Sequence, residues 1–110
     1  MKKNGPWKII DSSVKYKNPW ISVREDKVLR PDGKSGIFGV VEMVAGSSVL
    51  PMDERGNVYL TKEFKYATSK ESIEVISGAI DANESPLNAA KRELKEELGC
   101  IAKKWISLGN

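Results

Sequence analysis

Three glutamates in one short stretch, Glu93, Glu96 and Glu97, are spaced as neighbours on a helix. A helix there would gather their carboxylates on about a third of its circumference. Like charges on adjacent turns repel by roughly a few tenths of a kcal/mol per pair, so the cluster favours a compensating cation. Mg²⁺ prefers oxygen ligands and usually binds through one or two carboxylates. The spacing therefore indicates a platform for a divalent metal ion, with a solvated face of a surface helix as the alternative.

The sequence contains no histidine. This excludes general acid–base catalysis by histidine, a Ser-His-Asp triad and zinc bound through imidazole. Any catalysis must therefore use carboxylates, lysines, hydroxyl groups or a hard metal ion.

The acidic cluster is expected on a helix over residues 86–98. Ser85 is a good N-cap, Pro86 suits the first helical position, and Gly99 supplies the C-terminal stop. An apolar stripe at offsets of three, four and seven would face the core; its members are Leu87, Ala90, Leu94 and Leu98. A short strand made by Ile73, Val75 and Ile76 should lead into Ser77 and Gly78, where glycine permits a close approach by a metal or phosphate.

The rest of the chain is rich in predicted β-strands separated by turn-forming residues. The expected strands cover residues 7–16, 21–30, 37–44, 48–52, 58–64 and 101–108. Alternating side chains and a turn at 53–57 predict a hairpin between the fourth and fifth of these.

Length and composition indicate one globular domain. The chain has 110 residues, a net charge of +3 and scattered lysines, and no compact basic-aromatic motif, so nucleic-acid binding is disfavoured as its main role. No apolar stretch approaches the ~20 residues needed to span a bilayer. The only cysteine, Cys100, cannot form an internal disulfide, which agrees with a reducing compartment; the cytoplasm is expected.

The spacing around the cluster reproduces a known motif. The motif is the Nudix box, G-x5-E-x7-R-E-U-x-E-E-x-G-U, where U is a bulky aliphatic residue. In this chain it reads Gly78, five residues, Glu84, seven residues, and then Arg92-Glu93-Leu94-x-Glu96-Glu97-x-Gly99. Only Cys100 departs from it, and this change affects packing rather than chemistry. The chain therefore resembles the Nudix hydrolases.

That resemblance implies a loop–helix–loop that binds Mg²⁺ or Mn²⁺. Glu93 and Glu97 would be metal ligands, Glu96 would bind or orient in the same cluster, and the carbonyl of Ser77 would add a ligand. Arg92 would pair with acids to hold the loop. The implied fold is α+β, a Nudix-type α/β/α sandwich with a mixed β-sheet, preceded by N-terminal antiparallel strands. The implied reaction is hydrolysis of a diphosphate linkage.

Residues upstream are similar to ADP-ribose pyrophosphatases, which carry segments like "vrQyR" and "lElPaG". The corresponding segments here are residues 61–65 and 73–78. Glu74 matches the glutamate of the second segment. Lys65 stands where the first segment has arginine, and Ile76 stands where the second has proline. Lysine lacks the bidentate fork of arginine, and a solvated lysine is the favoured reading over a substrate contact. ADP-ribose, cleaved to AMP and ribose 5-phosphate, is the best substrate hypothesis.

Trp7 and Trp20 stand where such relatives place aromatics that can stack on adenine. Packing within the strands is the favoured interpretation of both, and stacking is the alternative. The N-terminal strands could also pair two copies into a homodimer.

The expected organisation is an N-terminal β-strand region, 1–42, followed by a Nudix core, 43–110, that includes the box at 78–100. The core is expected to lack its C-terminal part, through fragmentation, a truncated gene or completion by another chain; we favour a fragment. A nucleotide-binding module without turnover is the alternative function. A hydrolase of RNA caps or nucleoside triphosphates is a weaker alternative.

Overall fold

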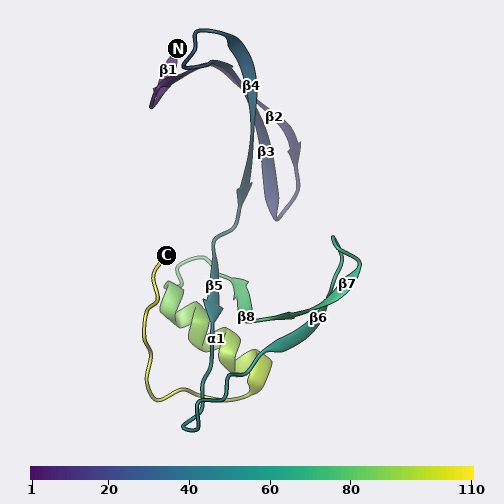
Figure 1. Ribbon diagram of the computed structural model, residues 1–110, viewed down its shortest axis with the longest axis vertical. Helices are drawn as coiled ribbons and strands as arrows, with labels where there is room; N and C mark the ends of the chain where they lie inside the picture. The colour runs from purple at the N-terminus through teal and green to yellow at the C-terminus, as the bar shows by residue number, and fades with distance from the viewer. The chain divides into compact units, whose positions relative to one another are not determined.

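The computed structural model describes residues 1–110, which divide into two compact units, Met1–Val44 and Ala45–Asn110. Figure 1 shows the strands of the first unit and the strands and helix of the second. No helix is long and apolar enough to cross a membrane.

The first unit is a four-stranded antiparallel sheet in the order β1-β2-β3-β4. A tight turn at Gly5, whose φ is +57°, joins β1 to β2, and Gly33 takes a φ of +82° between β3 and β4. The predicted strands 7–16 and 21–30 are confirmed as β2 and β3. The strand bounds are β1 (Lys2–Asn4), β2 (Trp7–Lys17), β3 (Ile21–Leu29) and β4 (Ser35–Met43).

Two aromatic side chains, Trp7 and Phe38, pack together on one face of this sheet. The rings of Trp7 and Phe38 meet edge to face, with centroids 5.6 Å apart. Asp26, the register partner of Phe38, is buried on this face, and its Oδ1 accepts hydrogen bonds from Ser12 (2.6 Å) and from Arg24 Nε (2.9 Å). The hydrogen bond from Ser12, followed by that from Arg24, lowers the pKa of Asp26, so the buried carboxyl stays ionised.

The second unit contains two antiparallel strand pairs and one helix. Strand β5 pairs with β8, and β6 pairs with β7 as a hairpin. The elements are β5 (Gly46–Val49), β6 (Thr61–Lys65), β7 (Lys70–Glu74), β8 (Ile76–Ala79) and α1 (Pro86–Leu98). This combination confirms the predicted α+β class.

Helix α1 begins and ends where the sequence predicts. The Ser85 hydroxyl accepts a hydrogen bond from the Asn88 N–H, and Pro86 opens the first turn. Gly99 adopts the left-handed conformation, with a φ of +65°, and its N–H donates to the carbonyl of Lys95 at 2.8 Å. Both ends are therefore capped by local chemistry.

The core of the second unit lies between α1 and the β5–β8 pair (Figure 1). Its buried members are Val49, Ile76, Ala90 and Leu94, against which Leu98, Ala102 and Trp105 also pack. The periodic stripe along the helix therefore faces the strands, as predicted, except that Leu87 is half exposed.

Several predicted strands differ from the observed ones. The strand predicted at 101–108 is wrong: these residues pair with no strand, and Trp105 instead packs on the core. The predicted strand through Ile73 and Ile76 is broken at Val75, because its two parts pair with different partners. The strand predicted at 48–52 ends at Val49, and only an isolated bridge joins Met52 to Val58. The three differences share one cause: a strand also needs a neighbouring strand to hydrogen-bond with its backbone, and the pattern of side chains along the sequence does not show where that neighbour lies.

We predict that Leu94→Ala lowers the free energy of unfolding by about 2–4 kcal/mol, because Leu94 is 2% exposed and truncation leaves a cavity. Leu87→Ala, on the same helix but at a 47% exposed position, should cost less than about 1 kcal/mol. Urea unfolding of the two variants checks this. Equal losses would contradict the assigned core.

Candidate functional site

The carboxylate of Glu93 lies directly against the backbone of β8 at Gly78. Glu93 is 8% exposed. A Cβ atom added at Gly78 would lie 2.0 Å from Glu93 Oε1 and 2.8 Å from its Cγ, which are impossible contacts. Gly78 has no positive φ, so glycine is needed here for space rather than for backbone conformation. The strand and the helix therefore fix the position of this carboxylate together.

Arg92 ties the loop before the helix to the helix itself. Its Nε and Nη2 donate to the two oxygens of Glu84, each at 2.9 Å, in a bidentate pair. Nη2 also donates to the Ala79 carbonyl at 2.9 Å, and Nη1 donates to Glu93 Oε1 at 3.0 Å. Nη1 reaches Glu96 more weakly, at 3.4 Å. All five N–H donors of the guanidinium are thus directed at oxygens of this loop and helix.

Glu84 closes the loop from its other side. Its Oε1 accepts a hydrogen bond from the Asp81 N–H at 3.1 Å as well as from Arg92. The Arg92 hydrogen bonds, followed by the one from Asp81, lower the pKa of Glu84. The same carboxylate raises the pKa of Arg92, which remains a cation. Glu84 is therefore an ionised anchor for the arginine, in agreement with its place in the box.

The other two glutamates of the box are more open. Glu96 and Glu97 are exposed, and Glu97 makes no ion pair. No three acidic or cysteine side chains come close enough together to hold a metal ion. The structure thus places Glu93 and Glu97 one turn apart on α1, with Arg92 neutralising part of the charge. The donor chemistry suits a hard cation, since every candidate ligand is an oxygen.

Ser77 immediately precedes Gly78 on β8. Its hydroxyl lies 2.8 Å from that of Ser48 on β5, its register partner. Neighbouring Ser47 points toward the helix and donates to the Pro86 carbonyl at 2.9 Å. Sequence reasoning missed both β5 serines and the Ala79 carbonyl, because no local pattern shows which strand lies beside β8.

Lys65 and Glu74 come together on the β6–β7 hairpin. Lys65 Nζ lies 3.1 Å from Glu74 Oε2 and 3.0 Å from Glu63 Oε2. The lysine is therefore paired with two carboxylates while 41% of its side chain stays exposed to solvent.

The two candidate stacking tryptophans belong to the first unit and differ from each other. Trp7 is partly buried and packs on Phe38, as the packing interpretation expects. Trp20 is 72% exposed in the turn between β2 and β3, where its backbone N–H donates to Asn18 Oδ1 at 2.8 Å. Packing within a strand is therefore the wrong interpretation for Trp20, and its ring is free to contact a ligand.

We predict that Gly78→Ala lowers the free energy of unfolding by about 1–3 kcal/mol, because the added methyl group must displace the Glu93 carboxylate. Gly39→Ala is the control, since its Cβ would meet nothing within 4 Å. Chemical denaturation measures both. A Gly78 variant as stable as the control would show that the close contact is absent in solution.

We also predict that stability falls in acid partly through Glu84. Because its folded-state pKa is lower than its ordinary value of 4.5, its contribution is present above pH 4.5 and is lost as the pH falls through the lowered value. Glu84→Gln should flatten this part of the stability profile. The control, Glu54→Gln, changes an exposed residue without an ion pair and should leave the profile unchanged. Identical acid slopes for wild type and Glu84→Gln would refute the prediction.

Comparison with known proteins agrees with this geometry. Residues 43–110 match the NUDIX domain, and residues 7–41 match the nucleoside diphosphate sugar hydrolase N-terminal domain. An ADP-ribose pyrophosphatase of Mycobacterium tuberculosis is 30% identical over 97 residues, which are 87% of this chain and 47% of that protein. One from Bacillus subtilis is 30% identical over 88 residues, which are 80% of this chain and 48% of that protein.

A solved structure described as an ADP compounds hydrolase superposes with a TM-score of 0.76 at 23% identity. The match covers 94% of this chain and 57% of that one, and it confirms the fold. The chain spans about half the length of the curated relatives it matches. Because the NUDIX match covers most of the chain and includes the Gly78–Glu93 contact and the Arg92 network, this protein belongs to the Nudix hydrolase family.

Proposed function

We propose that this protein hydrolyses a diphosphate linkage in a nucleoside diphosphate derivative, with ADP-ribose, cleaved to AMP and ribose 5-phosphate, as the substrate. The observation that carries the proposal is the Glu93 carboxylate, fixed between Gly78 and Arg92 at the start of the acidic face of α1. The two relatives named ADP-ribose pyrophosphatase support the choice of substrate.

We assign four groups to hold Mg²⁺ or Mn²⁺: the carboxylates of Glu93, Glu96 and Glu97 and the carbonyl of Ser77. Such an ion neutralises charge on a bound diphosphate and lowers the pKa of a coordinated water. Glu93 is the preorganised member of the set, since Gly78 and Arg92 define its position. Glu97 is the open member, since it makes no ion pair and is free to turn toward a cation.

Arg92 acts in this proposal by positioning, and it does not contact the substrate. All five of its donors are directed at Glu84, Glu93, Glu96 and the Ala79 carbonyl, so none is left for a phosphate oxygen. Its task is to hold the loop 79–84 and the Glu93 carboxylate in one fixed arrangement.

We further propose that the exposed ring of Trp20 contacts the base of the nucleotide, and that the strands of the first unit pair two copies into a homodimer. Strand β4 carries exposed apolar side chains, including Ile37, Val41 and Met43, that a second copy could cover. The cytoplasm is the proposed compartment, because the only cysteine is unpaired.

A nucleotide- and metal-binding module without turnover is the second candidate. It is favoured by one observation: the protein brings no three acidic ligands together, and Arg92 already compensates Glu93. Two results together would identify such a module. Mn²⁺ would bind, as detected by paramagnetic relaxation, and ADP-ribose would remain intact after long incubation.

We predict that Glu93→Gln and Glu97→Gln each lower Mg²⁺-dependent cleavage of ADP-ribose by about 100-fold or more, because losing a metal-ligating charge removes several kcal/mol of transition-state stabilisation. Phosphorus NMR would follow AMP and ribose 5-phosphate. Glu54→Gln, in the exposed 53–57 turn, should retain full activity. Unchanged turnover in both box variants would refute these roles, and a panel with nucleoside triphosphates and capped RNA would test the substrate.

A further inference from the structure

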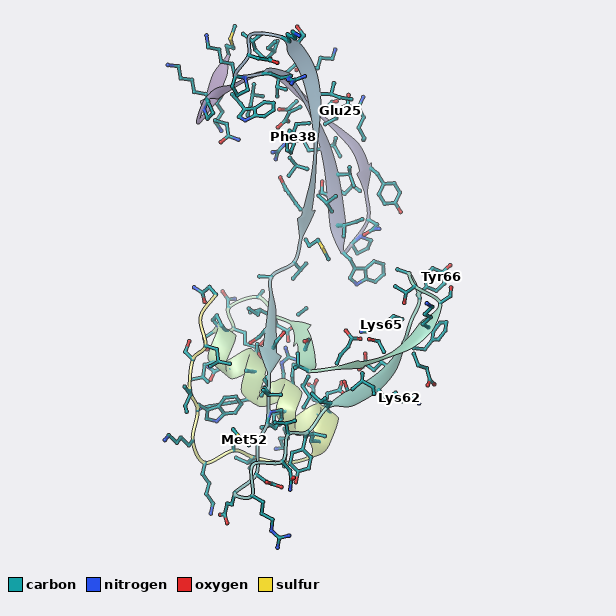
Figure 2. All side chains as sticks on the ribbon, viewed as in Figure 1. Glu25, Phe38, Met52, Lys62, Lys65 and Tyr66 are labelled. Atoms are coloured by element: carbon teal, nitrogen blue, oxygen red, sulfur yellow. The ribbon has the colours of Figure 1, made fainter.

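Strand β8 has one neighbouring strand and therefore one free edge. It pairs with β5 alone, in the register that places Ser48 opposite Ser77. The β6–β7 hairpin, which carries Lys62, Lys65 and Tyr66 in Figure 2, forms a separate two-stranded sheet. Backbone groups of β8 that point away from β5 are therefore not used by another strand.

The direction of each carbonyl of β8 follows from one hydrogen bond at the end of the strand pair. The Ile80 N–H donates to the Ala45 carbonyl at 2.9 Å, so these two opposite residues are a hydrogen-bonded pair. Bonded and non-bonded pairs alternate along antiparallel strands, which puts Ala79 and Ser77 at non-bonded positions. Backbone groups at non-bonded positions point away from the partner strand. The carbonyls of Ser77 and Ala79 therefore both leave β8 on its free edge.

Helix α1 reaches this free edge through Arg92. The Nη2 atom of Arg92 donates to the Ala79 carbonyl at 2.9 Å, which agrees with a carbonyl that is turned away from β5. The Ser77 carbonyl leaves β8 on the same edge, and no loop or side-chain donor occupies it. The edge therefore presents one carbonyl that Arg92 has engaged and, two residues before it, one that is free to accept.

A chain of hydroxyl groups holds Ser77 in place. The Oγ atoms of Ser48 and Ser77 lie 2.8 Å apart, and Ser77 Oγ lies 3.5 Å from the Val75 carbonyl, where the chain passes from β7 into β8. Side chains at a non-bonded pair stand closest together, which accounts for the short distance between the two hydroxyls. Because no backbone hydrogen bond joins Ser77 to β5, the hydroxyl pair is the direct link between the strands at this position.

We propose that Ser48 is a positioning residue: its hydroxyl holds Ser77 so that the Ser77 carbonyl keeps its direction on the free edge, and this direction sets the affinity for a divalent ion. Ser48 itself does not contact the ion. The inference rests on the proposed function, in which the Ser77 carbonyl is one of the metal ligands. Groups that orient a metal ligand influence affinity without touching the metal.

NMR of the metal-free full chain tests the geometry. The amides of Ser77 and Ala79 should be protected from hydrogen exchange at least about tenfold less than the amide of Gly78, which lies at a bonded position. The carbonyl ¹³C resonance of Ser77 should move in Ser48→Ala and return close to its wild-type position in Ser48→Thr, which keeps the hydroxyl. Equal protection of the three amides, or an unmoved Ser77 carbonyl in Ser48→Ala, would overturn the proposal.

Binding of Mn²⁺, followed by electron paramagnetic resonance, tests the effect on the ion. Ser48→Ala and Ser77→Ala should each raise the Kd for Mn²⁺ by about threefold to tenfold. The double variant should be no worse than about twofold beyond either, since the same link is lost in all three. Ser48→Thr should bind Mn²⁺ as the wild type does. Ser72→Ala is the control, because the Ser72 hydroxyl on β7 makes no hydrogen bond within the protein.

A purely structural role for Ser48 predicts a different result: the urea midpoint of Ser48→Ala would fall below that of Ser72→Ala while its Kd for Mn²⁺ stayed unchanged. That result, additive losses in the double variant, or no rescue by Ser48→Thr would overturn the positioning role. Failure of the proposed function is distinguishable. A wild-type protein that binds no Mn²⁺ overturns the metal site and this proposal with it, whereas equal Mn²⁺ binding by wild type and Ser48→Ala overturns this proposal alone.

Discussion

The Glu93 carboxylate occupies the space that a side chain at position 78 would need, and the close approach of α1 to β8 depends on this contact. A charged group almost removed from water needs compensation, and Arg92 supplies it from the neighbouring position on the helix. Arg92 in turn needs partners for its remaining donors, which Glu84 and the Ala79 carbonyl provide. The burial of one carboxylate thus links the end of β8, the loop that follows it and the middle of α1.

This network divides the acidic cluster into a fixed part and an open part. Glu93 is held by the fold, whereas Glu97 is exposed and without an ion pair. A fixed carboxylate beside an exposed, unpaired one suits a divalent ion, because the first sets the position and the second can adapt to the coordination geometry. The energetic cost of burying Glu93 is offset by the hydrogen bond from Arg92 Nη1 at 3.0 Å.

The β6–β7 hairpin also pairs a cation with a partly buried carboxylate, but through a weaker interaction. Lys65 compensates a partly buried carboxylate, as Arg92 does, but it is a point charge without a planar fork. Both cations pair with neighbouring carboxylates, although each keeps part of its side chain exposed to solvent.

The sequence alone determined the features that are local. The bounds of α1, its caps and the box spacing follow from residues that act within one or two turns, and the structure agrees with them. Tertiary structure alone decided which strands pair, why residues 101–108 form no strand, and that Lys65 pairs with Glu74 across the hairpin. It also decided that Glu93 is buried against Gly78. These features depend on contacts between segments distant in the chain, and the spacing of residues along the chain carries no information about which segments meet.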